Sequence, residues 1–555
     1  MKIYKLRVQN YKSFKDEQVL NLYGSRYALI GRNNSGKSSL INAIHLILGS
    51  KDPRYMNLDE TYYFDSSKEL LIEITLVTND LKEIWDLPTT KKNKGIFAGK
   101  FNKDPMSAQI TLTINQKLDG SIADKFLIRI GGFPVHQKVA DLRNALAKNV
   151  VALPNRSAKE DLSASKWTSF GVLMKSILES SPRYQELQNH LEQINVLIEE
   201  MLNDEKTQIL DSSQIITFIE DIKFQLTKEN KPSELLRNLE LFVKENNKYF
   251  HISDTGTGTQ STIIIAILEL ALKHKATKSK LLCIEEPELF IHPQGVRFLS
   301  QLIDRIINET DCQVIVSSHS PIFISGLDPR SIVRIEKTND GSLIHQLPAN
   351  YTDEDNKIKR SLNSENAEMF FSSNVVLVEG ETEKILFSQL SENLKSDDGK
   401  DLNYFKNNCS VCSVGGKDNI GNYIEILNKY NIPVKAVVDD DYLDMEKSYR
   451  KICDDNGIDK TLPKEDLRQQ LIDIGVRPLA EGETEDLIPN SDITDLTGML
   501  EDDIIAIKEA QPKTSKALVK QIFKKTKPEI AYDISEYYKE KGESPFDEII
   551  KWGIE

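Results

Sequence analysis

Residues 31–39 read Gly-Arg-Asn-Asn-Ser-Gly-Lys-Ser-Ser, a glycine-rich loop between the apolar run at 27–30 and the largely apolar stretch at 40–44. The loop matches the pattern G-x-x-x-x-G-K-[ST] in its required context, a strand that leads into a helix. Its backbone N–H groups can surround phosphate oxygens, and the dipole of the following helix favours the same anion. We expect Lys37 to contact the β- and γ-phosphates of a nucleotide and Ser38 to ligate Mg²⁺. The predicted nucleotide-binding residues of this loop are Gly31, Asn33, Asn34, Ser35, Gly36, Lys37, Ser38 and Ser39.

The size and composition of the chain predict a multidomain protein without a membrane span. Its 555 residues exceed one ordinary hydrophobic core. No apolar run approaches the roughly 18 residues that a membrane-spanning helix needs, and the N-terminus alternates like a strand, so we expect a cytoplasmic protein. Because the net charge is −14, any contact with nucleic acid must use a local basic face or metal ions. Cys409 and Cys412 form one C-x-x-C, which we interpret as buried strand thiols because no second pair completes a zinc site.

The residue pattern of the first half of the chain changes from strand-like to helical. Alternating apolar residues predict strands at 3–8, 18–22, 68–78 and 108–114, the first part of a β-rich nucleotide-binding domain over 1–157. Residues 158–250 carry long helical patterns and little glycine. The apolar stripe there has spacings of four, three, four and three residues, and consists of Leu187, Leu191, Ile194, Ile198 and Met201. Such a stripe packs either within its own subunit or against a second copy, and the sequence leaves both possibilities open.

A second set of motifs follows at 251–348 and completes the same domain. A small-residue loop that contains Gly256 and Gly258 opens an apolar helix. The apolar strand at 281–284 ends in the carboxylates Glu285 and Glu286, and the strand at 314–316 leads to His319. A buried strand that ends in paired carboxylates suits an enzyme with a phosphate-binding loop, because one carboxylate contacts the Mg²⁺ shell and the next orients the attacking water.

In this order and spacing, GRNNSGKSS, TGTGTQS, LLCIEEPELFIHP and VIVSSHSP resemble the ABC-type ATPases of the SMC, Rad50 and RecF group. The resemblance implies that the loop with Gly256 and Gly258 crosses to the ATP of a second subunit. Glu286 would be the catalytic carboxylate and His319 the switch histidine. Two features depart from the group: Glu285 stands where most members have aspartate, and TGTGTQ only loosely matches the signature. ATP binding is therefore the safer expectation, and rapid hydrolysis the weaker one.

A new α/β unit begins after a polar linker at 349–370 and occupies 371–555. The apolar strand at 374–378 runs into Glu379 and Gly380, and a later strand runs into Gly415-Gly416-Lys417. A third strand at 434–438 runs into Asp439-Asp440-Asp441. The carboxyl ends of parallel strands meet at one edge of a sheet, so these side chains should converge. Glu379, Asp439 and Asp441 would repel one another without a cation, and their oxygen ligands suit Mg²⁺ or Mn²⁺.

The pattern V-E-G, G-G-K and D-x-D resembles the Toprim domain of primases, topoisomerases and some nucleases. An SMC-like ATPase followed directly by a Toprim domain resembles the OLD (overcoming lysogenization defect) nuclease family over nearly the whole chain. The fold class implied is α/β: an ABC/SMC-like P-loop ATPase domain with a helical dimerisation insertion, then a C-terminal Toprim domain. The activity implied is nucleotide-regulated, two-metal cleavage of double-stranded DNA.

The resemblance also implies roles for single residues. Glu379, Asp439 and Asp441 match the first-metal set, and Glu383, one helical turn after Glu379, matches the second-metal carboxylate. In the acidic loop 481–487 we choose Glu485, with Glu483 as the alternative. We choose Lys527 of the lysine-rich segment 513–527 as the catalytic lysine, with Lys525 of that segment and Lys541 beyond it as alternatives. These lysines could equally form a solvated face or contact DNA phosphates.

Within the family, the chain length and compact insertion are most similar to the GajA-type nucleases of the Gabija anti-phage system. This implies a homo-oligomer, dimer or tetramer, that acts with a UvrD-like helicase partner of the GajB type. A stand-alone OLD nuclease would share every motif. A non-cleaving, RecF-like DNA-bound ATPase is the main alternative, but the complete carboxylate set favours cleavage. An enzyme that cuts and reseals DNA would need a tyrosine from another domain, and we see no winged-helix segment to carry it.

Overall fold

The computed structural model describes residues 2–49, 52–56, 58–78, 109–119, 126–136, 139–147, 150–153, 174, 177–204, 239–245, 247–256, 258–260, 262–263, 266–267, 270, 280–289, 291–351, 362, 366–396, 398–480, 482–510 and 518–554. It divides into two compact units, residues 1–26 with 38–318 and residues 27–37 with 319–555. Most of the predicted linker, much of the helical insertion, Glu481, Lys513 and Lys516 lie outside the described residues. The predicted domain boundaries stay predictions.

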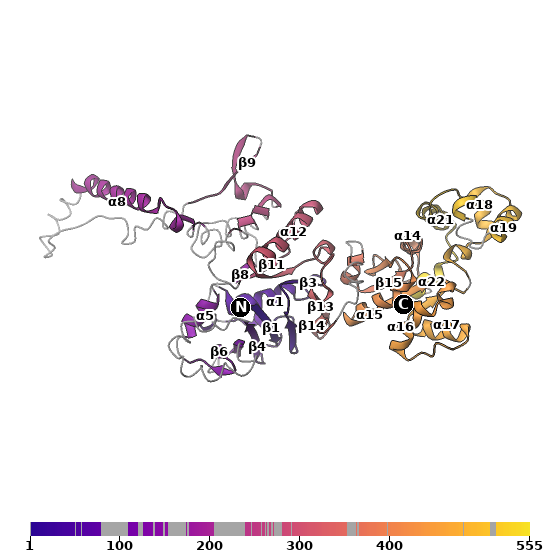
Figure 1. Cartoon of the computed structure of the whole chain (residues 1–555), viewed down its shortest axis with the longest axis horizontal. Coiled ribbons are helices and arrows are strands. Elements are labelled where there is room, and N and C mark those ends of the chain that lie inside the picture. The colour runs from indigo at the N-terminus through magenta and orange to yellow at the C-terminus, as the bar shows by residue number, and fades with distance from the viewer. Residues whose placement is uncertain are drawn as a thin grey trace. The chain divides into compact units, whose positions relative to one another are not determined.

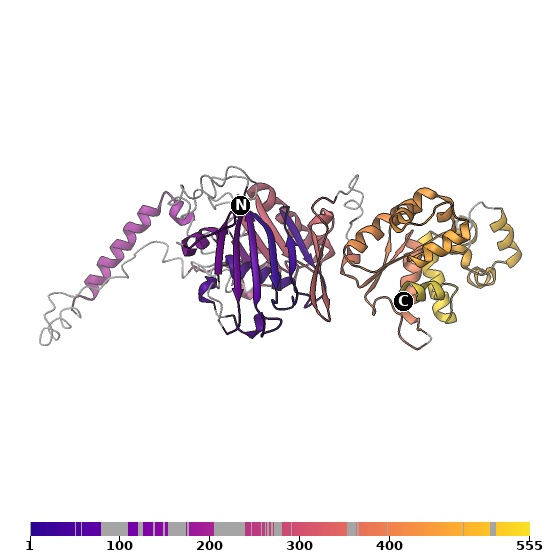
Figure 2. The same ribbon diagram turned by 90° about the horizontal axis from the view of Figure 1, so that it is seen from below.

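The first unit contains an antiparallel sheet with the strand order β2-β1-β4-β5-β6-β7 (Figure 2). Its strands are β1 (Lys2–Gln9), β2 (Gln18–Asn21), β4 (Leu70–Val77), β5 (Gln109–Gln116), β6 (Phe126–Ile130) and β7 (Phe133–Pro134). The four strands predicted for this region are therefore confirmed. Leu6, Ile74 and Leu112 stand side by side in the ladder and are fully buried, which is how alternation in sequence becomes one apolar face.

Parallel strands form the other layer of the first unit, in the order β12-β11-β8. They are β8 (Val150–Leu153), β11 (Lys280–Glu285) and β12 (Cys312–Ser317), of which β8 was not predicted. Helix α12 (Pro293–Thr310) packs against β12, and the unit also contains α1 (Lys37–Leu48) and α5 (Val139–Ala147) (Figure 1). The buried amide of Gln313 joins β12 to β1: its oxygen accepts from Ile3 N at 2.9 Å, and its nitrogen donates to Ile3 O at 2.9 Å.

Helix α8 (Tyr184–Met201) carries the predicted apolar stripe. Leu191 is buried, whereas Ile194 and Met201 are 43% and 79% exposed in the single chain. The hairpin of β9 (Phe242–Glu245) and β10 (Lys248–His251) follows. The helix is confirmed, and its role in dimerisation stays a prediction.

The second unit holds two sets of strands. In the first set, β3 (Arg26–Ile30) pairs in parallel with β13 (Ile332–Thr338), which pairs antiparallel with β14 (Gly341–Gln346). The apolar run at 331–335 predicts β13, whereas no strand was predicted over β14. The second set is a parallel sheet with the order β16-β15-β17-β18, made of β15 (Asn374–Val378), β16 (Cys409–Ser413), β17 (Val434–Val438) and β18 (Val476–Pro478).

This parallel sheet is covered on both faces, which explains its continuous apolar strands. Val375 and Leu377 of β15 belong to a core with α15 (Ile420–Lys429), α16 (Glu446–Asn456) and α17 (Lys464–Asp473). Val376 and Val378 point the other way, into a core with α14 (Glu381–Leu390) and the C-terminal helices. Those helices are α18 (Asn490–Thr497), α19 (Glu501–Glu509), α21 (Lys527–Lys541) and α22 (Asp547–Ile554) (Figure 1). None of the helices in the described part of the chain is long and apolar enough to cross a membrane.

Candidate metal centre and nucleotide loop

Three carboxylates converge at the carboxyl edge of the parallel sheet. Glu379 directly follows β15, and Asp439 and Asp441 follow the neighbouring strand β17. One oxygen from each of the three lies within 4.8 Å of the others. The backbone N–H of Asp439 donates to Glu379 Oε1 at 3.1 Å, so the two strand ends are joined directly. Adjacent parallel strands therefore bring together acids that lie 60 residues apart in the sequence.

Burial and mutual repulsion make two of these carboxyl groups hard to ionise. Burial, opposed by the Asp439 N–H and Lys417, raises the pKa of Glu379 to about 7. Burial, reinforced by the charges of Glu379, Glu383 and Glu485, raises the pKa of Asp439 to about 8. Both causes favour a bound cation, which restores the charged forms. The geometry and the hard oxygen ligands fit a divalent metal.

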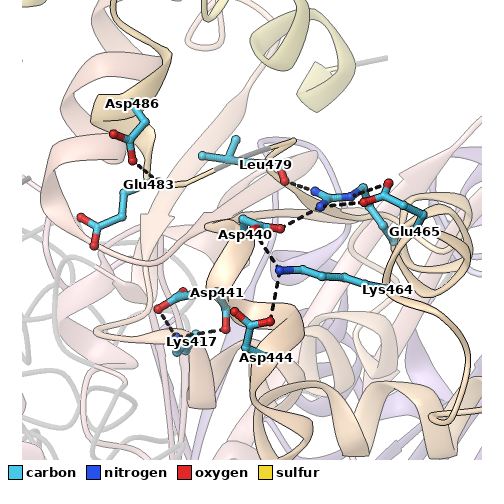
Figure 3. Close-up of polar contacts among 10 residues, drawn as sticks. Lys417, Asp440, Asp441, Asp444, Lys464, Glu465, Leu479, Glu483 and Asp486 are labelled. Carbon is cyan, nitrogen blue, oxygen red and sulfur yellow. Dashed lines mark hydrogen bonds and ion pairs between the residues drawn. The ribbon is translucent and has the colours of Figure 1, made fainter. Parts of the chain in front are cut away.

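Asp441 is held by a lysine from the third motif. Lys417 Nζ lies 2.7 Å from Asp441 Oδ2, and its side chain is only 16% exposed (Figure 3). Gly415 and Gly416 precede Lys417 with φ angles of +69° and +119°, and Gly416 N donates to Glu379 O at 3.0 Å. Two successive residues with positive φ explain why this turn contains two glycines. Lys417 is the last residue of the G-G-K pattern, but the pattern by itself assigns it no role in the site.

A second group of charges lies beside the first. Glu383 is buried on the first turn of α14, and its Oε2 accepts from Gly380 N at 2.9 Å. Glu485 is 3% exposed, and burial raises its pKa despite the opposing charge of Lys527. Lys527 Nζ lies 3.2 Å from Glu485 Oε1. The charges of Glu383 and Glu485 act on each other and on Asp439, so this second group adjoins the three carboxylates.

The alternative candidates Lys525, Lys541 and Glu483 make contacts that differ from those of Lys527 and Glu485. Lys525 Nζ pairs with Asp533 at 2.6 Å, and Lys541 Nζ pairs with the buried Asp492 at 2.7 Å. Glu483 begins the short helix η13 (Thr484–Leu487), where its N–H donates to Asp486 Oδ2 at 2.7 Å. The geometry thus favours Lys527 and Glu485 among the sequence candidates, and their catalytic roles stay predictions.

Thr484 completes the centre and has no counterpart among the sequence predictions. Its N–H and Oγ1 donate to Asp439 Oδ1 at 3.1 and 3.3 Å, and the residue is 1% exposed. A hydroxyl and an N–H on the same oxygen orient Asp439 and leave its other oxygen for a ligand. No sequence signal marks Thr484, because this contact joins residues 45 positions apart.

The C-x-x-C belongs to the sheet and not to the centre. Cys409 and Cys412 are both buried in β16, and burial raises the pKa of each thiol to about 12. Thiols with such pKa values stay protonated at neutral pH and ligate metal poorly. Their interpretation as buried strand thiols is confirmed.

The phosphate-binding loop has the backbone that its glycines predict. Gly31 and Gly36 have φ angles of +143° and +112°, and Asn34 has +59°. A Cβ on Gly31 would lie 2.2 Å from the carbonyl oxygen of Ile335, so only glycine fits there. Lys37 Nζ donates to Gly31 O at 3.0 Å and to Arg32 O at 2.8 Å, which closes the loop at the start of α1. A phosphate would compete with these carbonyls for the ammonium.

The other predicted nucleotide residues also end strands or begin helices. Glu285 ends β11, and Glu286 follows with a φ of +41° while its N–H donates to Ser317 O at 2.8 Å. A non-glycine residue in this conformation is strained, and such strain concentrates at functional sites. His319 follows β12. In the signature-like loop, Gly256 O accepts from Gln260 N at 3.1 Å and Gly258 O accepts from Thr262 Oγ1 at 2.9 Å.

Two family models match the chain. The model described as "AAA domain, putative AbiEii toxin, Type IV TA system" matches residues 26–325, more than half of the 555 residues. The model described as "Overcoming lysogenization defect protein-like, TOPRIM domain" matches residues 370–441, which include Glu379, Asp439 and Asp441. The predicted order of a P-loop ATPase domain followed by a Toprim domain is confirmed.

Three curated relatives align with most of the chain. The OLD nuclease of Thermus scotoductus is 24% identical over 79% of this chain and 81% of its own length. The Old nuclease of Escherichia phage P2 is 22% identical over 80% of this chain and 78% of its own length. Endonuclease GajA of Bacillus cereus is 21% identical over 85% of this chain and 81% of its own length. The predicted resemblance to OLD and GajA nucleases is confirmed.

Proposed function

We propose that this chain, which belongs to the AAA-domain family and joins that ATPase to an OLD-like TOPRIM domain, is a divalent-metal-dependent DNA endonuclease of the OLD family whose cleavage is regulated by ATP. The observation that carries the proposal is the convergence of Glu379, Asp439 and Asp441, with one oxygen from each within 4.8 Å of the others. A protein that only bound DNA would have no use for three mutually repelling, partly buried carboxylates.

The residues of the centre have distinct tasks in this proposal. Glu379, Asp439 and Asp441 hold a first Mg²⁺ or Mn²⁺, and Glu383 and Glu485 contribute to a second. Bound divalent metal activates the attacking water and stabilises the leaving oxygen of a phosphodiester. The protein orients the ligands. Thr484 holds one oxygen of Asp439, and Lys417 pairs with Asp441, whose oxygen would bind the metal in place of the ammonium. Lys527, about half exposed beside Glu485, is placed to meet a phosphate.

The ATPase domain is proposed to bind ATP with Mg²⁺. The phosphates occupy the loop 31–39, Ser38 and Glu285 contact the Mg²⁺, and Glu286 and His319 lie near the γ-phosphate. Gly256 and Gly258 of a second subunit complete the site, so ATP favours association of the ATPase domains. We further propose a cytoplasmic homo-oligomer that acts on double-stranded DNA in defence against phage. A UvrD-like helicase partner of the GajB type is part of this proposal, on the analogy with GajA.

The decisive experiment incubates the purified protein with supercoiled plasmid and Mg²⁺ or Mn²⁺, with and without ATP. Glu379→Ala and Lys37→Ala are tested beside the wild type. We expect the wild type to nick or linearise DNA, Glu379→Ala to be inactive, and Lys37→Ala to lose only the response to ATP. If no metal or nucleotide condition gives cleavage of plasmid or phage DNA, the protein is instead a non-cleaving DNA-bound ATPase.

The role in defence has its own test. Cells that express the wild-type chain, alone or with a helicase encoded beside it, are challenged with a panel of phages. We expect fewer plaques with the wild type than with Glu379→Ala at equal expression. Equal plaque numbers in both strains for every phage would remove the defence role and leave the nuclease proposal standing.

A further inference from the structure

In the sequence, Asp440 stands between the proposed metal ligands Asp439 and Asp441. Its carboxylate, however, is bound by two basic side chains of helix α17 (Figure 3). Oδ1 accepts from Arg468 Nη2 at 2.7 Å, and Oδ2 accepts from Lys464 Nζ at 2.9 Å. Both oxygens of Asp440 are therefore already occupied by basic side chains, and it is not a candidate ligand.

Arg468 makes a second contact that reaches a different loop. Its Nη1 donates to the carbonyl oxygen of Leu479, which follows β18 and begins the loop that leads to Thr484 and Glu485. Arg468 is 9% exposed, and its Nε lies 3.3 Å from Glu465 Oε2 on the same helix. One buried guanidinium thus bridges the loop after β17 and the loop after β18. A planar fork of donors suits this bridging, whereas a single ammonium could reach only one side.

Further bonds join the same two loops. Asp440 N donates to Gly482 O at 2.9 Å, and Thr484 N donates to Asp439 Oδ1 at 3.1 Å. The loops also carry like charges, because Glu483 and Glu485 both repel Asp439. Repulsion between partly buried charges tends to separate the loops. Arg468 opposes this separation through Asp440 and a backbone carbonyl, so it leaves the proposed ligand oxygens open.

We propose that Arg468 is a positioning residue of the metal centre: it fixes the loop after β17 to the loop after β18, so that Asp439 and Thr484 keep their contact. The inference rests on the proposed function for the identity of the centre. Residues that orient metal ligands typically change metal affinity by about 10- to 100-fold when they are removed. Loss of Arg468 should therefore act first on metal binding, and the chemistry at saturating metal should largely survive.

The first test measures Mn²⁺ binding to the full-length protein by calorimetry, without DNA or ATP, and uses Glu379→Ala to define background binding. Arg468→Met should bind Mn²⁺ about tenfold more weakly than the wild type. Arg468→Lys, which keeps the charge but not the fork, should fall between them. Lys464→Met is the matched control on the same helix. It should change the affinity for Mn²⁺ by less than about twofold. Lys464 is 38% exposed and contacts Asp440 and Asp444, which both belong to the loop after β17.

The second test measures plasmid cleavage against Mn²⁺ concentration. Arg468→Met should raise the half-saturating Mn²⁺ concentration about tenfold and lower the saturated rate by less than about threefold. The inference is contradicted if folded Arg468→Met binds Mn²⁺ as tightly as the wild type, or if it loses the saturated rate while its Mn²⁺ binding is normal.

If circular dichroism shows that Arg468→Met does not fold, Asp440→Asn replaces it. We then expect weaker Mn²⁺ binding, and unchanged binding would contradict the inference. Should the wild type cleave no DNA while Arg468→Met still binds Mn²⁺ more weakly, the nuclease proposal fails and the positioning role stands.

Discussion

The protonation of Glu379 and Asp439 should depend on whether a cation is bound. Their pKa values, raised to about 7 and about 8, mean that the folded centre retains protons that the unfolded chain releases at lower pH. A divalent ion binds the deprotonated carboxylates, so protons and metal compete for the same oxygens. The stabilisation that metal provides should therefore increase with pH.

Without divalent metal, the melting temperature should fall as the pH rises from about 6 to about 9. The sign follows from the raised pKa values of Glu379 and Asp439: their contribution to stability is present at low pH and is lost as the pH rises through about 7 and 8. Added Mn²⁺ should raise the melting temperature more at about pH 8.5 than at about pH 6. Scanning fluorimetry measures both trends. The variant Glu379→Gln with Asp439→Asn should flatten them, and an identical slope in that variant would show that other groups are responsible.

Lys527 should act on the rate and not on DNA binding alone. In Lys527→Met, the saturated cleavage rate should fall by about 100-fold, the typical effect of removing one electrostatic stabiliser of a transition state. Lys525→Met is the matched control, because its ammonium pairs with Asp533 instead of Glu485. Single-turnover cleavage at saturating protein and Mn²⁺ separates rate from affinity. Equal losses in the two variants would mean that these lysines serve only as phosphate contacts.

Helix α8 carries an apolar stripe that the described residues cover only in part. Leu191 is buried, but Ile194 and Met201 are 43% and 79% exposed. Contiguous exposed apolar residues on one helix face are typical of a surface that a partner covers. This supports the proposed role of the insertion in assembly.

Charges placed on that stripe should weaken assembly. The double variant Ile194→Glu with Met201→Glu should shift the protein to a smaller oligomer at micromolar concentration, because association would bury unpaired carboxylates. Light scattering after size-exclusion chromatography measures the mass. Glu192→Gln with Glu199→Gln changes charge elsewhere on the same helix and should leave the mass unchanged. A wild-type mass retained by the glutamate variant would mean that this stripe is not the assembly surface.

The whole molecule carries a net charge of −14, which opposes a polyanionic partner. Exposed lysines concentrate locally at its C-terminal part, where Lys520, Lys524 and Lys525 precede Lys527. A local basic segment near the metal centre can attract DNA where it must be cut. Its contribution should appear in the salt dependence of binding.

The variant Lys520→Gln with Lys524→Gln should bind DNA more weakly at low salt. The slope of log Kd against log salt should fall by about two, since each phosphate contact contributes roughly one unit. The saturated cleavage rate should stay close to that of the wild type. Fluorescence anisotropy with a catalytically inactive Glu379→Ala background measures the slope. A slope equal to that of the background protein would place the DNA contacts elsewhere on the chain.

Sequence alone determined many of the strands and the order of the two domains. A parallel strand covered on both faces must be apolar throughout, so the runs at 27–30, 374–378 and 434–438 could be recognised without knowledge of their neighbours. The phosphate-binding loop, Glu379 and the Asp439–Asp441 segment were equally visible, because each motif lies within a few residues of the chain. The missed strands include β8, β14 and β18, since their neighbours, and not their own pattern, make them part of a sheet.

The tertiary structure decided which further charged groups meet. The sequence favoured Lys527 and left Lys525 and Lys541 as alternatives, and in the structure Lys527 faces Glu485 whereas the other two face Asp533 and Asp492. In Asp439-Asp440-Asp441, the middle residue turns to Arg468 and its neighbours face Glu379 and Lys417. Thr484 lies in the predicted acidic loop 481–487 without a role assigned to it, and Arg468 belongs to none of the predicted motifs. The physical reason is that spacing along a chain determines contacts within a turn or a strand, whereas contacts between distant segments depend on how the sheet and its helices pack.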